Sequence, residues 1–401
     1  MKFLFDNESF SFETLRAIGF ACYGGADIGE VLMTAANIPE GDEPAWHREW
    51  KATAERVEQL GCDSLAASNP VSAREAFLRA SNYYRCAEFF RREDPWNDPE
   101  VALLASASRQ TFTDAMALCD FGFEQLTIPY ESTTLPAYLY LVDDSGKPRP
   151  TIVYISGFDS ALEESYFAIA AAALARGYNV LAIDGPGQGA ALRVQKLVFR
   201  PDWEAVVTPA IDYALMRPEI APDAIALFGY SLGGYLVARA AAFEHRLAAL
   251  ILDDAIYDFH AAMVHALPQF VGEWIEKKRD DVAGPVLALM MSVSTNVRWA
   301  MHNGMWAMGQ NTPADVPRAF KDYTLAGIAD RIRTPALVLD AENDQFLKGE
   351  PRRAAQALVN ADTTLVTLTS AEGAGEHCHM GAMYRVHQVI FDWLAHTLPK
   401  G

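Results

Sequence analysis

The chain has 401 residues, of which 51% are hydrophobic and 21% charged, so it can fill two or three folding units and is neither disordered nor fibrous in composition. Its net charge of −19 is spread along the chain without long acidic runs. This distribution argues against nucleic-acid and anionic-membrane partners, so we expect a small-molecule partner.

The N-terminal segment, residues 1–8, lacks the basic start, apolar stretch and cleavage site of a secretory signal. No window approaches the roughly 20 apolar residues of a membrane span. The five cysteines include no C-x-x-C pair that would indicate zinc or redox chemistry. We therefore expect a cytoplasmic protein with no membrane contact, no metal and no cofactor.

Residues 1–122 show helical punctuation and almost no strand signal, which predicts an all-helical N-terminal cap domain. The expected helices lie near Phe12 to Tyr23, Ile28 to Ala36, Glu43 to Leu60, Val71 to Phe90 and Pro99 to Cys119.

From residue 123 the pattern changes to a hairpin followed by alternating apolar strands and amphipathic helices, which predicts an α/β fold with a mostly parallel, helix-covered sheet. The segment 257–325 has no clear strand and predicts a helical lid-like insertion within a catalytic domain of residues 123–401. The expected strands are Phe123 to Pro129, Leu135 to Val142, Thr151 to Ile155, Asn179 to Ile183, Ala224 to Phe228, Ala248 to Leu252, Ala336 to Leu339 and Thr364 to Leu368.

The strongest chemical signal is the G-Y-S-L-G motif at Gly229–Gly233, which lies directly after an expected strand and directly before an expected helix. A nucleophile elbow needs this context, because its serine sits on a strained strand-to-helix turn with small flanking residues. The alternative is a glycine-rich helix start that Ser231 merely caps. We interpret Ser231 as the catalytic nucleophile of an α/β-hydrolase fold.

A serine hydroxyl is a weak nucleophile, so an acid and a histidine should follow in that chain order. An expected strand ends near Asp340, and the loop after it offers Glu342 and Asp344. We select Asp344 as the acid and leave Asp340 and Glu342 open as alternatives.

The expected histidine loop follows the next strand and is rich in glycine, with His377 and His379 close together. We select His377 as the base. The remaining alternative is His379, which otherwise would pack or bind substrate at the pocket edge. No third ligand is suitably spaced for these two histidines to bind a metal.

An oxyanion hole needs preorganised backbone N–H donors, and one comes from the residue after the nucleophile, Leu232. The second is expected after the first core strand, where Gly157 allows a tight turn before Phe158. Asp159 is unusual beside such a site. Either it caps the following helix, or it handles protons on a hydroxylated or enolisable substrate.

The segment Asp184–Gly189 is glycine-rich but lacks the spacing of a nucleotide-binding loop, so we interpret it as a turn packed near the elbow.

Together with the elbow, Glu342-Asn343-Asp344 and Gly375-Glu376-His377-Cys378, this segment resembles α/β-hydrolases that carry an N-terminal helical domain. That group includes 2,6-dihydroxypseudooxynicotine hydrolase and the melanin-pathway hydrolases that shorten polyketide chains. The helical stretch 79–90 is also similar, so the resemblance covers nearly the whole chain.

The resemblance implies a Ser231, Asp344 and His377 triad and cleavage of a carbon–carbon bond next to a ketone, although other members are esterases. It also attaches a substrate-handling role to Asp159. Tyr83 and Tyr84 either project from the helical domain into the pocket or belong to its core. The expected partner is a small carbonyl or acyl compound, and a homodimer is left open.

Three alternatives to carbon–carbon hydrolysis stay open at this point. The same triad could hydrolyse an ester, thioester or amide, or it could transfer the acyl group to an alcohol or amine. The third alternative, from another class, is a non-catalytic binding protein on a hydrolase scaffold.

Overall fold

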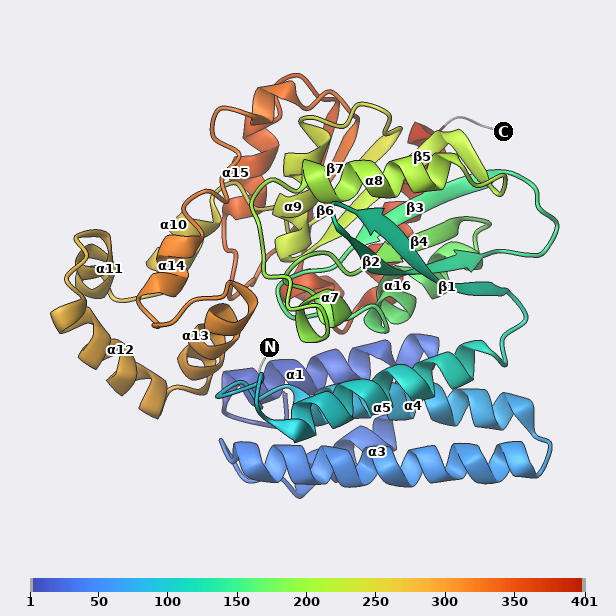
Figure 1. The fold of residues 1–401 in the computed structure, drawn as a ribbon, viewed down its shortest axis with the longest axis horizontal. Helices are drawn as coiled ribbons and strands as arrows, with labels where there is room; N and C mark the ends of the chain where they lie inside the picture. The colour runs from blue at the N-terminus through green and yellow to red at the C-terminus, as the bar shows by residue number, and fades with distance from the viewer. Residues whose placement is uncertain (1–2, 399–401) are drawn as a thin grey trace.

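The computed structural model describes residues 3–398 and has an eight-stranded sheet with helices on both faces (Figure 1). A separate layer of helices from the N-terminal part of the chain lies along one side of the sheet domain. A helical excursion, drawn in yellow-brown and orange, projects beyond it in Figure 1.

The N-terminal layer consists of five α-helices that end just before the first strand. Three of them begin at an aspartate whose carboxylate accepts a bond from a first-turn amide, and proline follows the cap in two of these. Their shared core centres on Trp46 and Trp50, which are fully buried. The helices are α1 (Glu8–Gly19), α2 (Ile28–Ala36), α3 (Glu43–Ala66), α4 (Pro70–Glu88) and α5 (Pro99–Met116), with a short 3-10 turn at Phe20–Tyr23.

The sheet has the strand order β1-β2-β4-β3-β5-β6-β7-β8, and all eight strands expected from the sequence are present. The first two form an antiparallel hairpin that pairs antiparallel with β4, and the remaining neighbours are parallel. The strands are β1 (Gly122–Tyr130), β2 (Thr133–Leu141), β3 (Arg149–Ile155), β4 (Asn179–Ile183), β5 (Ile220–Tyr230), β6 (Ala249–Asp253), β7 (Ala336–Ala341) and β8 (Thr363–Leu368). The predicted α/β-hydrolase architecture is thereby confirmed.

Alternate residues of the central strands enter two different cores, as strand geometry requires. Val153 and Ile155 of β3 pack with one set of helices, whereas Ile152 and Tyr154 pack on the other face together with side chains of the N-terminal layer. The sequence did not predict the short helices α6 and α7. The covering helices are α6 (Ala171–Leu174), α7 (Gly189–Arg193), α8 (Glu204–Leu215), α9 (Leu232–Ala241), α15 (Glu350–Ala357) and α16 (Met383–Thr397).

The excursion between β6 and β7 is helical throughout its regular elements. It leaves and re-enters the core at adjacent points, because Asp258 and Thr324 form an isolated antiparallel bridge. No helix within residues 3–398 combines the length and apolarity that crossing a bilayer requires. The helices of the excursion are α10 (Phe259–His265), α11 (Gln269–Glu276), α12 (Asp280–Val293), α13 (Thr295–Ala307) and α14 (Asp315–Ala319).

The N-terminal layer contacts the sheet domain through a buried histidine of α16. Nδ1 of His387 lies 2.7 Å from the hydroxyl of Tyr23, and Nε2 lies 2.6 Å from the carbonyl oxygen of Ala168. Burial lowers the pKa of His387 from 6.5 to about 4. The neutral ring donates to the carbonyl and accepts from the tyrosine, so a second proton would displace the Tyr23 bond.

This histidine should make the fold acid-sensitive. The unfolded chain takes up the proton near pH 6.5 and the folded chain only near pH 4, so stability falls as the pH drops through this window. The expected loss is about 3 kcal/mol of unfolding free energy. Urea unfolding of the wild type and of His387→Gln at the two ends of this pH window tests the expected loss, because the unfolding free energy of the variant should depend less on pH. An equal pH dependence in the two proteins would contradict the role of His387.

Candidate active site

The G-Y-S-L-G segment forms a strained turn between β5 and α9. Ser231 has φ 59° and ψ −124°, a backbone conformation that non-glycine residues rarely adopt. A Cβ on Gly229 would lie 2.1 Å from the carbonyl oxygen of Gly233, and one on Gly233 would lie 2.6 Å from that of Ile155. Both glycines are therefore required by close packing, as a nucleophile elbow demands.

The structure brings His377 to the tip of this turn. Nε2 of His377 lies 2.8 Å from Oγ of Ser231, and Nδ1 lies 2.8 Å from Oδ2 of Asp344. The imidazole is buried beside the ring of Phe346, whose centroid is 5.1 Å away. The three side chains thus form a continuous hydrogen-bonded line with the geometry of a Ser-His-Asp triad.

Asp344 is oriented by the loop after β7. Its Oδ1 accepts bonds from the amides of Phe346 and Leu347 at 2.7 and 3.0 Å, which leaves Oδ2 for the histidine. The two alternatives to Asp344 have other partners: Asp340 accepts from the hydroxyl of Thr367, and Glu342 accepts from the amide of Ser370.

A second carboxylate, which sequence reasoning missed, lies beside the same imidazole. Oδ2 of Asp254 is 3.1 Å from Nδ1 of His377 and also accepts a bond from the amide of Cys378. Burial opposes the charged form of His377, but Asp344 and Asp254 raise its pKa above the ordinary value. A proton accepted from Ser231 would therefore be stabilised on the ring. The available signal was Asp253-Asp254 at the end of the strand after the elbow.

The alternative base, His379, occupies a different environment. It is fully buried, its Nδ1 lies 2.8 Å from the carbonyl oxygen of Ala374, and its Nε2 lies 3.3 Å from Oδ1 of Asp253. Burial opposes its charged form, but Asp253 raises its pKa to about 9. His379 does not line the cavity described below, so the structure does not place it at the pocket edge.

The two candidate oxyanion donors belong to turns that meet at the nucleophile. Leu232 is the first residue of α9, and Phe158 follows Gly157 after β3. A Cβ on Gly157 would lie 2.9 Å from Cβ of Ser231, so only glycine permits this approach. Both Phe158 and Leu232 line the cavity beside Ser231.

The glycine-rich segment 184–189 supports the turn before Phe158. Nε2 of Gln188 donates to the carbonyl oxygens of Ser156 and Gly157 at 2.6 and 3.1 Å. Asp184 accepts a bond from the amide of Ala190, and burial raises its pKa to about 7. These contacts have the structural role expected for this segment.

Asp159 faces a side chain of the N-terminal layer. Its carboxylate accepts bonds from the guanidinium of Arg16 at 3.1 and 3.5 Å. Burial would raise the pKa of Asp159, but Arg16 outweighs it and lowers the value. An ionised carboxylate is a hydrogen-bond acceptor and not a proton donor.

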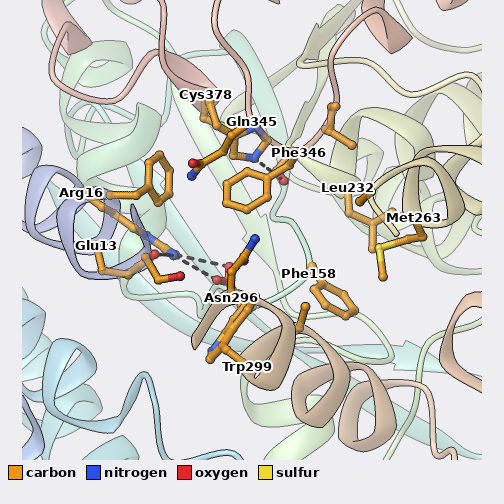
Figure 2. Close-up of a pocket in the computed structure, with 18 of the residues that line it drawn as sticks. Glu13, Arg16, Phe158, Leu232, Met263, Asn296, Trp299, Gln345, Phe346 and Cys378 are labelled. Carbon is orange, nitrogen blue, oxygen red and sulfur yellow. Dashed lines mark hydrogen bonds and ion pairs between the residues drawn. The ribbon is translucent and has the colours of Figure 1, made fainter. Parts of the chain in front are cut away.

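A cavity of about 190 Å³ opens in front of Ser231 (Figure 2). Aromatic and aliphatic side chains form most of its lining. Glu13 and Arg16 lie on one side in Figure 2, and Asp159, which accepts a bond from Arg16, also lines the cavity. The lining comes from α1, the residues just after α4, the turns after β3 and β5, the excursion, the loop after β7 and the histidine loop. Prominent apolar members are Phe12, Phe89, Phe158, Met263, Trp299 and Phe346.

Tyr83 and Tyr84 lie in the core of the N-terminal layer and do not line this cavity. The hydroxyl of Tyr83 donates to Glu30, and that of Tyr84 donates to Glu58. We therefore give them no part in the proposed site.

Two groups of side chains within residues 3–398 could supply three metal-ligand atoms each. They are Asp254, His377 and Cys378, and Asp253, Asp254 and His379. The first group contains His377, whose imidazole nitrogens already face Ser231 and Asp344, and the second group shares Asp254 with the first. These groups are better explained as support for the histidine loop.

The profile of the serine aminopeptidase S33 family matches residues 146–375, more than half of the chain, including Ser231 and Asp344. Hydrolase LUC6 of Fusarium sp is 36% identical to this chain, and the similarity covers 99% of this chain and 98% of that protein. This chain belongs to the S33 family of serine α/β-hydrolases.

Two further similarities extend over nearly the whole chain. The 20-hydroxy-prefusarin hydrolase FUS2 of Gibberella moniliformis is 34% identical to this chain, and the similarity covers 99% of this chain and 98% of that protein. The solved structure of 2,6-dihydroxy-pseudo-oxynicotine hydrolase has a TM-score of 0.76 at 20% identity and covers 95% of each chain. The resemblance expected from the sequence is therefore confirmed for family and fold.

The proposed role of Asp344 as the acid that orients His377 can be tested by the substitution Asp344→Asn. The new amide would face Nδ1 of His377, which favours the tautomer with its proton on Nε2, and that nitrogen then cannot accept from Ser231. Because Asp254 lies 3.1 Å from the same nitrogen, we expect a loss of about 10²-fold in kcat for the single variant and about 10⁴-fold with Asp254→Asn added.

Steady-state kinetics of both variants, with Asp340→Asn as the matched control, checks this expectation. Asp340 lies near the end of β7, the strand before the loop that carries Asp344, but it accepts a bond from Thr367 and pairs with Arg352. A larger loss in Asp340→Asn than in Asp344→Asn would contradict the assignment.

Proposed function

We propose that this hydrolase cleaves an acyl bond of a small organic substrate with Ser231 as nucleophile, His377 as base and Asp344 as the orienting acid. The observation that carries the proposal is the line from Asp344 through His377 to Ser231, with both contacts at 2.8 Å, facing an apolar cavity. The amides of Phe158 and Leu232 are the proposed oxyanion donors.

In the proposed first step, His377 takes the proton of Ser231 while Oγ bonds to the substrate carbonyl carbon, which leaves an oxyanion. Collapse of this intermediate breaks the bond to the leaving group. The protonated His377 then returns its proton to that group. Water, activated by the same ring, attacks the acyl-enzyme and releases the acid.

The bond that we favour is a carbon–carbon bond next to a ketone, as the family resemblance implies. The electron pair then leaves on a carbon, and a neighbouring ketone must delocalise it as an enolate until His377 protonates that carbon. Full-length similarity to a protein named 20-hydroxy-prefusarin hydrolase supports a substrate from secondary metabolism.

Ester, thioester or amide hydrolysis and acyl transfer use the same residues and remain the alternative functions. Mass spectrometry of products from a panel of β-diketones, acylphenols and aryl esters tests the bond type, and added alcohols or amines test transfer. We expect β-diketones to yield a carboxylic acid and a ketone. Faster turnover of esters across the panel would replace the carbon–carbon proposal with an esterase.

We further propose that residues 1–122 act as a cap that completes the pocket, with 257–325 as its lid. Support comes from Phe12, Arg16 and Phe89, which line the cavity from the N-terminal layer. Phe20 of this layer also stacks on Phe167 with ring centroids 5.2 Å apart.

Removal of residues 1–122 should therefore expose apolar surface, cause aggregation and abolish turnover. Light scattering and kinetics of the shortened protein measure these effects. A soluble shortened protein with full activity would contradict the cap proposal.

A further inference from the structure

One side of the cavity in front of Ser231 is built from buried ionic side chains. Arg16 of α1 pairs with Asp159 at 3.1 Å and with Glu164 at 2.7 Å. Arg85 of α4 pairs with Glu13 at 3.2 Å. The dashed lines in Figure 2 mark part of this network, and Glu13, Arg16 and Asp159 line the cavity itself.

The guanidinium of Arg16 has no donor left for a ligand. Nε donates to Glu164, one terminal nitrogen donates to Glu13 and Asp159, and the other donates to Glu164, Ser160 and Asp159. An arginine has five N–H donors, and all of them have acceptors here. Arg16 therefore holds the carboxylates in place and does not present a free cationic fork to the cavity.

The carboxylates, in contrast, keep capacity to accept. Each carboxylate has about four acceptor positions. Asp159 uses two of them for Arg16, and its side chain is 16% exposed. Glu13 accepts one bond from Arg16 and one from Arg85. What this wall offers a ligand is an acceptor for an O–H or N–H group.

The charge of the network excludes an anionic ligand at this wall. Its three carboxyl groups, those of Glu13, Asp159 and Glu164, face two guanidinium groups, those of Arg16 and Arg85. The sum over these five groups is negative when all are ionised and zero when one carboxyl holds a proton, and Arg92, which also acts on Asp159, is itself paired with Glu88. Neither state attracts a carboxylate or a phosphate.

The rest of the cavity is mostly apolar, and its other polar side chains are neutral ones such as Asn296 and Gln345, together with Ser231 and His377. Phe12, Phe89 and Phe346 lie around it together with Met263 and Trp299. A ligand that fills this space should have an apolar body. A hydroxyl on that body is best placed against Asp159, because a hydrogen bond to a charged carboxylate is stronger than one to a neutral amide such as that of Asn296 or Gln345.

We propose that the wall formed by Glu13 and Asp159 is a specificity site that binds a hydroxyl group of an otherwise apolar, uncharged substrate. This inference rests on the proposed function, because the same substrate must present its carbonyl to Ser231. The hydroxyl donates to the carboxylate of Asp159, which Arg16 holds in position. Asp159 is then a binding residue and takes no part in proton transfer.

The test uses nitrophenyl esters of straight-chain acids of increasing length, each made with a methyl, a hydroxyl or a carboxylate group at the far end. A second set carries the same three groups on the alcohol side of the ester. A hydrogen bond from a hydroxyl to a charged acceptor should raise kcat/KM about tenfold over the methyl ester at the chain length that reaches the wall. The carboxylate ester of that length should be the poorest of the three.

The variants are Asp159→Asn and Glu13→Gln, with Asp202→Asn as the matched control. Asp202 also pairs with an arginine, Arg200, at 2.7 Å, but it does not line the cavity. Asp159→Asn should reduce the ratio of kcat/KM between the hydroxyl and methyl esters to about twofold or less, whatever its effect on the methyl ester alone. The control Asp202→Asn should keep the full preference for the hydroxyl ester, whereas Glu13→Gln should weaken this preference.

The ratio between matched esters separates recognition from a role in shaping the neighbouring turn. If Asp159 only held the amide of Phe158 in place, both esters would slow by the same factor and the preference would survive. That result, or a methyl preference at every length in both sets, would overturn the inference while Ser231 still turned over esters. No turnover of any ester, with Ser231 inert to a fluorophosphonate, would instead overturn the proposed function.

Discussion

Ser231→Ala should lower kcat by about 10⁶-fold and abolish labelling by a fluorophosphonate, while the protein keeps its fold. The change removes only Oγ, the atom 2.8 Å from Nε2 of His377. Alanine has the same Cβ as serine, so the left-handed backbone at this position is no more strained than before. Activity of about 10³-fold over water should remain, because binding and the oxyanion donors are intact.

Ser9→Ala is the matched control for this prediction. Ser9 lines the same cavity from α1, so its loss tests whether any hydroxyl in the pocket matters. We expect Ser9→Ala to keep labelling and most of its turnover. Labelling and turnover are measured on samples whose unfolding transitions have been compared. Near-normal turnover in folded Ser231→Ala protein would remove Ser231 from the mechanism.

His377→Ala should cost about as much as the loss of the nucleophile, because it removes the proposed base, whose Nε2 lies 2.8 Å from Oγ of Ser231. The change also leaves Asp344 and Asp254 buried without the ring that both contact. We therefore expect lower stability as well as loss of labelling at Ser231. Labelling rates and urea unfolding of the same sample separate the two effects.

His379→Ala provides the comparison, because it removes the partner of another buried aspartate, Asp253. An unpaired buried charge is strongly destabilising, at about 3–5 kcal/mol. Folded His379→Ala protein should nevertheless label at Ser231, since His379 lies outside the cavity. Labelling retained in His377→Ala and lost in His379→Ala would transfer the role of base to His379.

The strands were predictable because their signal is local. A run such as 224–228 is apolar at every position, which is typical of a strand covered on both faces, and the structure buries all of it. The helix at Ala171–Leu174 was missed because the alanine-rich segment around it has no polar face to reveal a helical period.

The candidate triad was also accessible from the sequence, because each member lies just after a recognisable strand and parallel strands deliver their following loops to one edge of the sheet. The choice between His377 and His379 was weaker in the sequence, since both occur in one short loop. Only the structure distinguishes them, with one ring 2.8 Å from Ser231 and the other against Asp253.

By itself, the sequence determined the order of strands and helices, the family and the segment that carries the serine, because these depend on residues close together in the chain. Only the tertiary structure decided that Asp254 approaches His377 across 123 positions of sequence and that Arg16 holds Asp159 across 143. No local pattern marks such pairs. They form because the sheet and the N-terminal layer pack together, and packing determines which buried charges meet.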